Sequence, residues 1–102
     1  MIVVRMVFQA KWGKSNEVVE EFAKMEPMMR RFVGPKAKIR VLTDLSGSFH
    51  TVVQEVELES LAKWEQVRAA MFASPEMAEM PADMAMPFDG GRTEFYTLEK
   101  SW

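Results

Sequence analysis

The sequence predicts an α+β domain in which a four-stranded antiparallel sheet carries two helices on one face. The first observation is the order of the elements, because the apolar periodicity changes along the chain as strand, helix, strand, strand, helix, strand. The second is a short turn between the middle two strands, which predicts a hairpin. The third is that the strands are apolar on both faces. Two helices on one face leave the other uncovered, so we expect a second copy of the chain to cover it.

Length and composition limit the function classes. A chain of 102 residues indicates one domain, residues 1–102, which buries roughly 65% of the surface of its unfolded chain. The 13 basic and 15 acidic residues give a net charge of −2 without a dense basic stripe, so no nucleic-acid partner is expected. The absence of cysteine excludes disulfides, thiolate nucleophiles and cysteine-based metal sites, and it fits a cytoplasmic location. The apolar run 2–8 is too short to span a membrane and lacks a signal-peptide cleavage pattern, so no membrane span is expected.

The first three strands are predicted from period-two alternation. In the first, 2–10, one face carries Ile2, Val4, Met6 and Phe8, and the other carries Val3, Arg5, Val7 and Gln9. The second strand is expected over 37–44 and the third over 49–58. The Ser-Gly-Ser turn at 46–48 between them predicts an antiparallel hairpin.

Two helices are expected. The first runs over about 16–31, with Ser15 as the N-cap, although Pro27 predicts a kink or a break with a restart. Its apolar stripe consists of Val18, Phe22, Met25, Met29 and Phe32. The second helix is capped by Ser60 and runs over about 61–73.

The end of the chain is less regular. Residues 75–88 contain four methionines among three prolines, which predicts a helical turn or two followed by a loop. The Asp-Gly-Gly sequence at 89–91 is a strong turn signal, and the last strand is expected over 92–99. Phe95 and Tyr96 point to opposite sides of that strand, and the pattern leaves open which one faces the helices.

Two strand–helix–strand units around a hairpin predict the ferredoxin-like arrangement, with strand order four, one, three, two. The uncovered sheet face then mixes apolar and charged residues, which suits a homodimer interface, although a solvated sheet with ordinary cross-strand pairs would also fit. Arg5 and Arg40 are both expected to reach Glu55 on this face. The candidate interface residues are Val3, Arg5, Val7, Arg40, Leu42, Val53 and Glu55.

Two stretches resemble a known family. ELESLAKWEQVRAAMFASPEM, residues 57–77, resembles the second-helix signature of NIPSNAP-type dimeric α/β-barrel proteins, and KWGKSNEVVEEFAKM, residues 11–25, resembles their Gly-Lys loop and first helix. Antibiotic-biosynthesis monooxygenases and other stress-responsive barrels share this plan. The resemblance implies a ferredoxin-like protomer, a dimeric α/β barrel and often a cavity between sheet and helices. It implies no reaction, because these folds carry many activities.

His50 is the only histidine and is expected at the start of the third strand, on the helical side, where it could act as a general base or axial ligand. The alternative is a half-exposed histidine at the edge of a turn. A lone histidine without nearby carboxylate spacing predicts no metal site. The sequence contains no phosphate-binding loop or nucleophile elbow, so no catalytic residue is assigned.

Trp64 resembles by position a tryptophan of haem-degrading barrels. Those enzymes also need an asparagine on the first strand and a histidine farther along the second helix, and this chain has neither. Haem degradation is therefore not expected, and no cofactor is predicted. Trp64 is interpreted as a core residue or a pocket wall.

The polar residues Gln54, Thr43 and Tyr96 on apolar strands, together with His50, are candidates to orient a ligand beneath the helices, or each is simply hydrogen-bonded in the sheet. The methionines after the second helix suggest an adaptable apolar lid, or loose packing. The candidate pocket residues are His50, Gln54, Trp64, Met71, Met80, Met84 and Tyr96. We expect a homodimeric barrel that binds an apolar or aromatic small molecule, with or without chemistry. The enzymatic version would be a cofactor-free monooxygenase- or isomerase-like enzyme. The alternative is a non-catalytic structural protein that acts through its oligomer.

Overall fold

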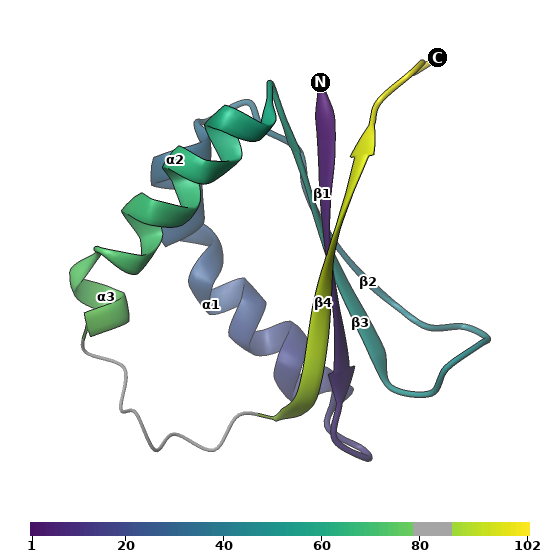
Figure 1. Cartoon of the computed structure of the whole chain (residues 1–102). Coiled ribbons are helices and arrows are strands. Elements are labelled where there is room, and N and C mark those ends of the chain that lie inside the picture. Colours follow the sequence, from purple (N-terminus) through teal and green to yellow (C-terminus); the bar gives the residue numbers. More distant parts are fainter. Residues whose placement is uncertain (79–86) are drawn as a thin grey trace.

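The computed structural model describes residues 1–78 and 87–102 (Figure 1). The elements in order are β1 (Ile2–Ala10), α1 (Ser15–Val33), β2 (Ile39–Thr43), β3 (Thr51–Leu58), α2 (Leu61–Phe72), α3 (Pro75–Ala78) and β4 (Phe88–Thr97). The predicted α+β class and element order are confirmed, with α3 as the short helical turn expected after α2. None of the helices among these residues is long and apolar enough to cross a membrane.

The four strands form one antiparallel sheet in the order β2-β3-β1-β4, which is the predicted ferredoxin-like order. Figure 1 shows the helices on one side of the sheet and no helix on the other. We call these sides the helical face and the uncovered face. The uncovered face is the one that carries Val3, Arg5, Val7, Arg40, Leu42, Val53 and Glu55.

The core lies between the helical face and the helices, because the alternation of β1 and β3 directs their most apolar residues there. One cluster of buried residues contains Val4, Met29, Val33, Val56, Leu58, Trp64 and Val67. A second cluster contains Ala10, Val18, Phe22 and Val52. Phe8 borders the second cluster, with its ring centroid 5.1 Å from that of Phe22 and 4.9 Å from that of Phe88.

The helix ends differ in how well they were predicted. Ser60 caps α2 as expected, since its side chain accepts a hydrogen bond of 3.1 Å from the backbone N–H of Lys63. The helix expected over 16–31 is present as α1, but its predicted N-cap was wrong. Lys14 is the N-cap and makes no capping bond with its side chain, while Ser15 is already helical. The helix also does not break at Pro27. Buried side chains on both sides of Pro27 hold α1 against the sheet, and such packing outweighs local propensity.

The predicted turn at 89–91 is wrong, because these residues lie inside β4. Gly91 pairs with Phe8 of β1, and a Cβ at this position would come within 2.9 Å of Cδ1 of Phe8. The glycine therefore allows two strands to approach beside a large ring, rather than a reversal of the chain. The register also settles the orientation of β4. Phe95 pairs with Val4 on the helical face, and Tyr96 pairs with Val3 on the uncovered face.

Candidate functional site

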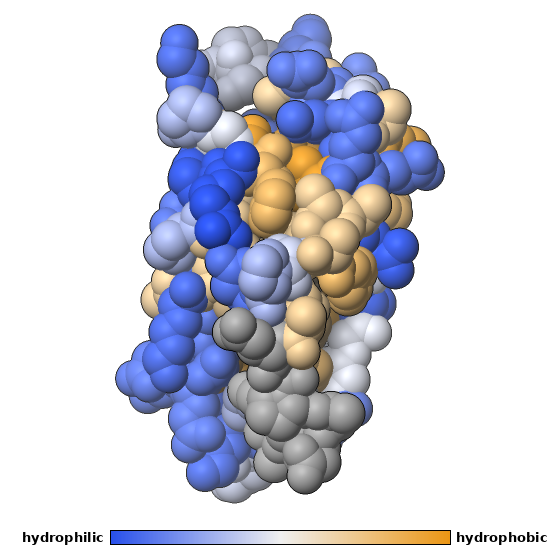
Figure 2. Space-filling model, turned by 90° about the vertical axis from the view of Figure 1, so that its left-hand side faces the viewer, coloured by the Kyte–Doolittle hydropathy of each residue, from blue (hydrophilic) through white to orange (hydrophobic). Residues whose placement is uncertain are grey.

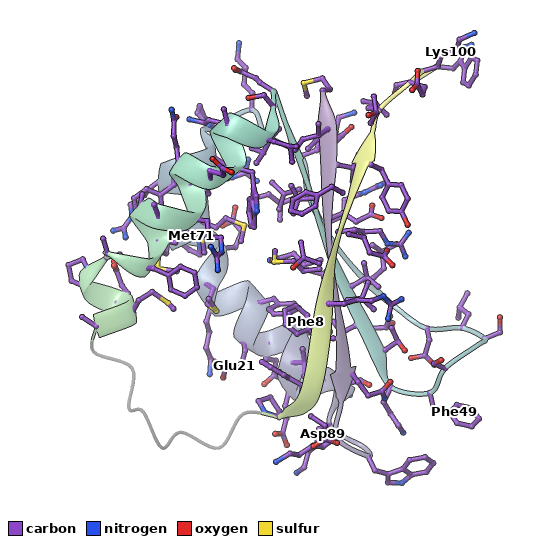
Figure 3. The ribbon with its side chains drawn as sticks, in the orientation of Figure 1. Phe8, Glu21, Phe49, Met71, Asp89 and Lys100 are labelled. Carbon is purple, nitrogen blue, oxygen red and sulfur yellow. The ribbon has the colours of Figure 1, made fainter. Side chains whose placement is uncertain are left out.

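A cavity of about 260 Å³ lies between the helical face and the helices. It is lined by Met6, Phe8, Phe22, Met25, Met29, Gln54, Trp64, Arg68, Met71, Phe72, Met77 and Thr93. We call it the methionine cavity. In Figure 3, Phe8 of β1 and Met71 of α2 lie on the facing sides of the sheet and the helical layer, whereas Phe49 lies beyond the sheet on its other side. Figure 2 views the helical side of the molecule and shows an apolar area bordered by polar side chains.

The walls of the methionine cavity are mostly soft and apolar. Among the described residues of the lining, five are methionines and four are phenylalanine or tryptophan. Methionine is unbranched and polarisable, so it adapts to irregular apolar shapes and packs well against rings. A mostly apolar cavity with a few polar groups is the usual form of a small-molecule site. The polar groups here are those of Gln54, Thr93 and Arg68.

Gln54 is the most informative of these polar residues. It lies on β3, pairs with Met6 of β1 and Val41 of β2, and is only 4% exposed. Within residues 1–78 and 87–102 its side-chain amide forms no hydrogen bond to the protein. Among the described residues, the side-chain atom that is fully buried without a hydrogen-bond partner is Arg5 Nε, so the amide of Gln54 still reaches the cavity. Such a group in a cavity wall is therefore positioned to bind a ligand that carries a hydrogen-bonding group.

Arg68 contributes a positive charge to the same cavity. Its guanidinium carbon lies 5.2 Å from the ring centroid of Phe72, one turn along α2. No carboxylate in the described part of the chain lies within ion-pair distance of it, and none of the residues that line the cavity is acidic. Arg68 therefore brings a positive charge to this edge of the cavity that is not paired within the described residues.

Three predicted pocket residues, Gln54, Trp64 and Met71, line the methionine cavity. Met80 and Met84 lie outside the described residues. His50 and Tyr96 do not line this cavity, and Thr43 lies on the edge strand away from it. The lining residues that sequence reasoning did not single out as site residues are Met6, Phe8, Phe22, Met25, Met29, Arg68, Phe72, Met77 and Thr93.

His50 is not on β3, contrary to the prediction, because the strand begins at Thr51. Its backbone has φ 58°, in the left-handed region that histidine adopts more readily than most residues. This conformation ends the strand alternation and turns the imidazole toward the start of α1. There Nδ1 lies 3.3 Å from the hydroxyl of Ser15, and the ring packs edge-on against Trp12 with centroids 4.6 Å apart.

The uncovered face is organised around Glu55, which is 8% exposed. Arg40 donates a hydrogen bond to one of its carboxylate oxygens, and Arg5 Nη1 lies 3.6 Å from the other. Both predicted pairs are therefore confirmed. Arg5 Nε also lies 3.7 Å from Glu94 of β4, so the charges form a row across the sheet.

Apolar residues lie beside this row of charges. Val7 and Val53 pair across β1 and β3 and are only 5% and 7% exposed. Leu42 and Tyr96, on the two edge strands, are 42% and 52% exposed. Tyr96 donates a 3.2 Å hydrogen bond to Glu94. The uncovered face thus combines buried valines at its centre with accessible apolar side chains at both edges.

No protein-family model and no curated protein sequence matches the chain. Solved structures do match it. An uncharacterised NIPSNAP domain protein from Burkholderia xenovorans superposes with a TM-score of 0.77 at 16% identity, covering 95% of this chain and 93% of that one. A NIPSNAP family protein of unknown function from Agrobacterium tumefaciens gives a TM-score of 0.76 at 12% identity, covering 93% and 85%. The chain has the fold of the NIPSNAP proteins.

A second kind of protein has the same fold. The haem-degrader MhuD from Mycobacterium tuberculosis, solved with two haems in its active site, gives a TM-score of 0.74 at 14% identity, covering 100% of this chain and 99% of that one. The predicted likeness to NIPSNAP-type barrels is thus confirmed at the level of the fold. At these identities the likeness does not extend to a reaction.

Proposed function

We propose that this chain is a homodimeric α/β-barrel protein that binds an apolar or aromatic small molecule in the methionine cavity. The observation that carries the proposal is the amide of Gln54, which lies in the cavity wall and has no hydrogen bond to the protein within the described residues. A ligand with an apolar body and one hydrogen-bonding group would satisfy this amide and fill the space beside it. The NIPSNAP fold supports the proposal, because MhuD, which shares it, holds a ligand in its active site.

The lining indicates what size and chemistry the ligand has. A volume of about 260 Å³ lies just below the roughly 300 Å³ at the lower end of typical ligand pockets, which suits a body of one or two rings. The only histidine of the chain does not line the cavity, so the lining residues do not fit a haem bound through histidine. An enzymatic version would be a cofactor-free monooxygenase or isomerase, in which Gln54 orients the substrate. Binding is the part of the proposal that the cavity supports directly.

The dimer in this proposal forms through the uncovered face. Its central valines are already nearly inaccessible, while Leu42 and Tyr96 at the edges remain open to a partner. A hollow of about 660 Å³ on this face is lined by residues of β1 and of both edge strands, and it offers room for side chains of a second sheet. Apolar residues mixed with paired charges are the composition expected of such an interface.

Binding is tested with the methyl groups of the methionines. Protein labelled with ¹³C at the methionine methyls is titrated with benzamide, 2-naphthamide and decanamide, three neutral molecules with different apolar bodies. We expect at least one of them to shift the cavity methionines and to leave Met1 unchanged, because Met1 does not line the cavity.

Thr93→Phe, which fills the cavity from β4, should abolish these shifts. Thr97→Phe, on the same face of β4 but outside the cavity, should preserve them. If neither these amides nor the matching acids, benzoate, 2-naphthoate and decanoate, shift a cavity methyl, ligand binding here is wrong.

The dimer is tested by sedimentation of Leu42→Arg and Val41→Arg. These neighbours on β2 are similarly exposed, at 42% and 39%, but they point to opposite faces of the sheet. We expect Leu42→Arg to yield monomers and Val41→Arg to remain dimeric, because only Leu42 faces the proposed partner. A wild-type monomer would contradict the dimer. A dimer whose cavity binds none of these amides or acids would favour the alternative, a structural protein that acts through its oligomer. The accessible apolar residues of the uncovered face support that alternative.

A further inference from the structure

We infer that the ligand of the methionine cavity is an amphipathic organic acid whose carboxylate is bound by Arg68. This inference rests on the proposed binding function and adds the chemical class of the ligand. It starts from the charge pairing of the arginines. Each of the other five arginines lies within 4.0 Å of a glutamate carboxylate: Arg5, Arg30, Arg31, Arg40 and Arg92. Arg68 is the exception among the described residues, and it is also the arginine that lines the methionine cavity.

The position of Arg68 suits an anion. Its guanidinium packs over the ring of Phe72 at 5.2 Å, and Phe72 lines the same cavity. Stacking on a ring engages the face of the guanidinium and leaves the N–H groups at its edge available. Those N–H groups match the two oxygens of a carboxylate and form charge-assisted hydrogen bonds with them.

The polarity of the whole cavity supports the same class. Methionine and aromatic side chains accept an apolar body, and among the described residues of the lining none is acidic and opposes a negative charge. Trp64 is 8% exposed, whereas Arg68, four residues later on α2, is exposed. An acid would therefore bury its apolar body and keep its carboxylate at an accessible edge, where the desolvation penalty is small. A neutral ligand would leave the charge of Arg68 unused, and a cation would be repelled by it.

The test uses matched pairs of acids and amides. Benzoate, 2-naphthoate and decanoate are compared with benzamide, 2-naphthamide and decanamide by the methionine-methyl titration. We expect the wild-type protein to bind the acid of at least one pair about tenfold or more tightly than its amide, as charge-assisted hydrogen bonds imply. The preference should weaken as the salt concentration is raised, because Arg68 is exposed to screening.

Three variants assign the preference to its source. Arg68→Gln should weaken the acid until acid and amide bind within about twofold of each other, and Arg68→Lys should restore part of the preference. Lys63→Gln removes a positive charge from the same helix outside the cavity and should leave the preference unchanged. Equal binding of acid and amide by the wild type, or an unchanged preference in Arg68→Gln, would overturn the inference and leave the proposed function standing. If no acid or amide binds at all, both are wrong.

Discussion

The two faces of the sheet differ in how their polar side chains are paired, although the same strands form both faces. On the helical face, side chains such as Val4 and Val56 are fully buried, and the polar group of Gln54 has no partner within the described residues. On the uncovered face, the polar group of Glu55 is also buried but has two arginine partners. A polar group that faces an apolar cavity without a protein partner is suited to a small ligand. Paired charges among accessible apolar residues are suited to another protein surface.

The largest expected effect on stability is a difference between alanine substitutions on the two faces of β1. Val4→Ala removes a fully buried side chain from the core and should lower the free energy of unfolding by about 2–3 kcal/mol. Val3→Ala, one residue earlier on the uncovered face, should cost under about 1 kcal/mol in the monomer, because Val3 is only half-buried there. Urea unfolding at several protein concentrations measures both. A cost for Val3→Ala that rises with protein concentration would show that a partner covers this face.

The next effect concerns the charges of the uncovered face. Glu55→Gln leaves Arg5 and Arg40 without their shared carboxylate and should lower the free energy of unfolding by roughly 1–3 kcal/mol. The matched control is Glu57→Gln on the same face of β3, whose pair with Lys38 is 3.9 Å long and involves an exposed lysine. This change should cost at most about 1 kcal/mol. Equal costs in thermal or urea unfolding would mean that the row of charges around Glu55 adds nothing beyond isolated pairs.

These contrasts also explain what the sequence could predict about the fold. Alternation along β1 and β3 determines which residues share a face, so the strand order and the pairing of Arg5 and Arg40 with Glu55 followed from the pattern. The location of His50 did not follow from the pattern. The backbone of His50 is itself left-handed, which takes its side chain out of the strand alternation, and sequence periodicity does not reveal a left-handed residue. The strand at 89–91 was also hidden, because glycine signals a turn and a close approach of strands equally well.

The candidate site was predictable only in part, for a similar reason. Gln54 stands out in the sequence because it is polar at an apolar position of a strand, and Trp64 and Met71 belong to the apolar side of α2. Arg68 gives no such signal, since a charged residue on a helix is typical of a solvent-exposed face. Its place at the cavity depends on how α2 packs over the sheet, and that packing is a tertiary property. Thr93 was hidden because the orientation of β4 was left open.

A smaller effect of opposite sign tests the unpaired amide. Gln54→Leu keeps a similar volume and puts an apolar side chain into an apolar wall in place of an amide that has no hydrogen bond in the described part of the chain, so it should raise the free energy of unfolding by up to about 1 kcal/mol. The matched control is Gln9→Leu on the uncovered face, where the amide donates a 2.7 Å hydrogen bond to the carbonyl of Phe49. That change should not stabilise the protein. A loss of stability in Gln54→Leu would indicate that the amide is already satisfied and would weaken the case for a ligand.

The smallest expected effect is the pH dependence of the uncovered face. The hydrogen bond from Arg92 to Glu94 lowers the pKa of this carboxyl below its ordinary value, and the hydrogen bond from Tyr96 acts in the same direction. A carboxyl whose pKa is lower in the folded state contributes stability above its unfolded pKa and loses it as the pH falls through the folded pKa. The midpoint temperature of thermal unfolding should therefore decrease when the pH is lowered below about 4.5. This decrease should be smaller in Glu94→Gln. If the two proteins show the same pH dependence, the row of charges at β4 is held too loosely to favour the ionised form of Glu94, and the interface proposal loses its support at that edge.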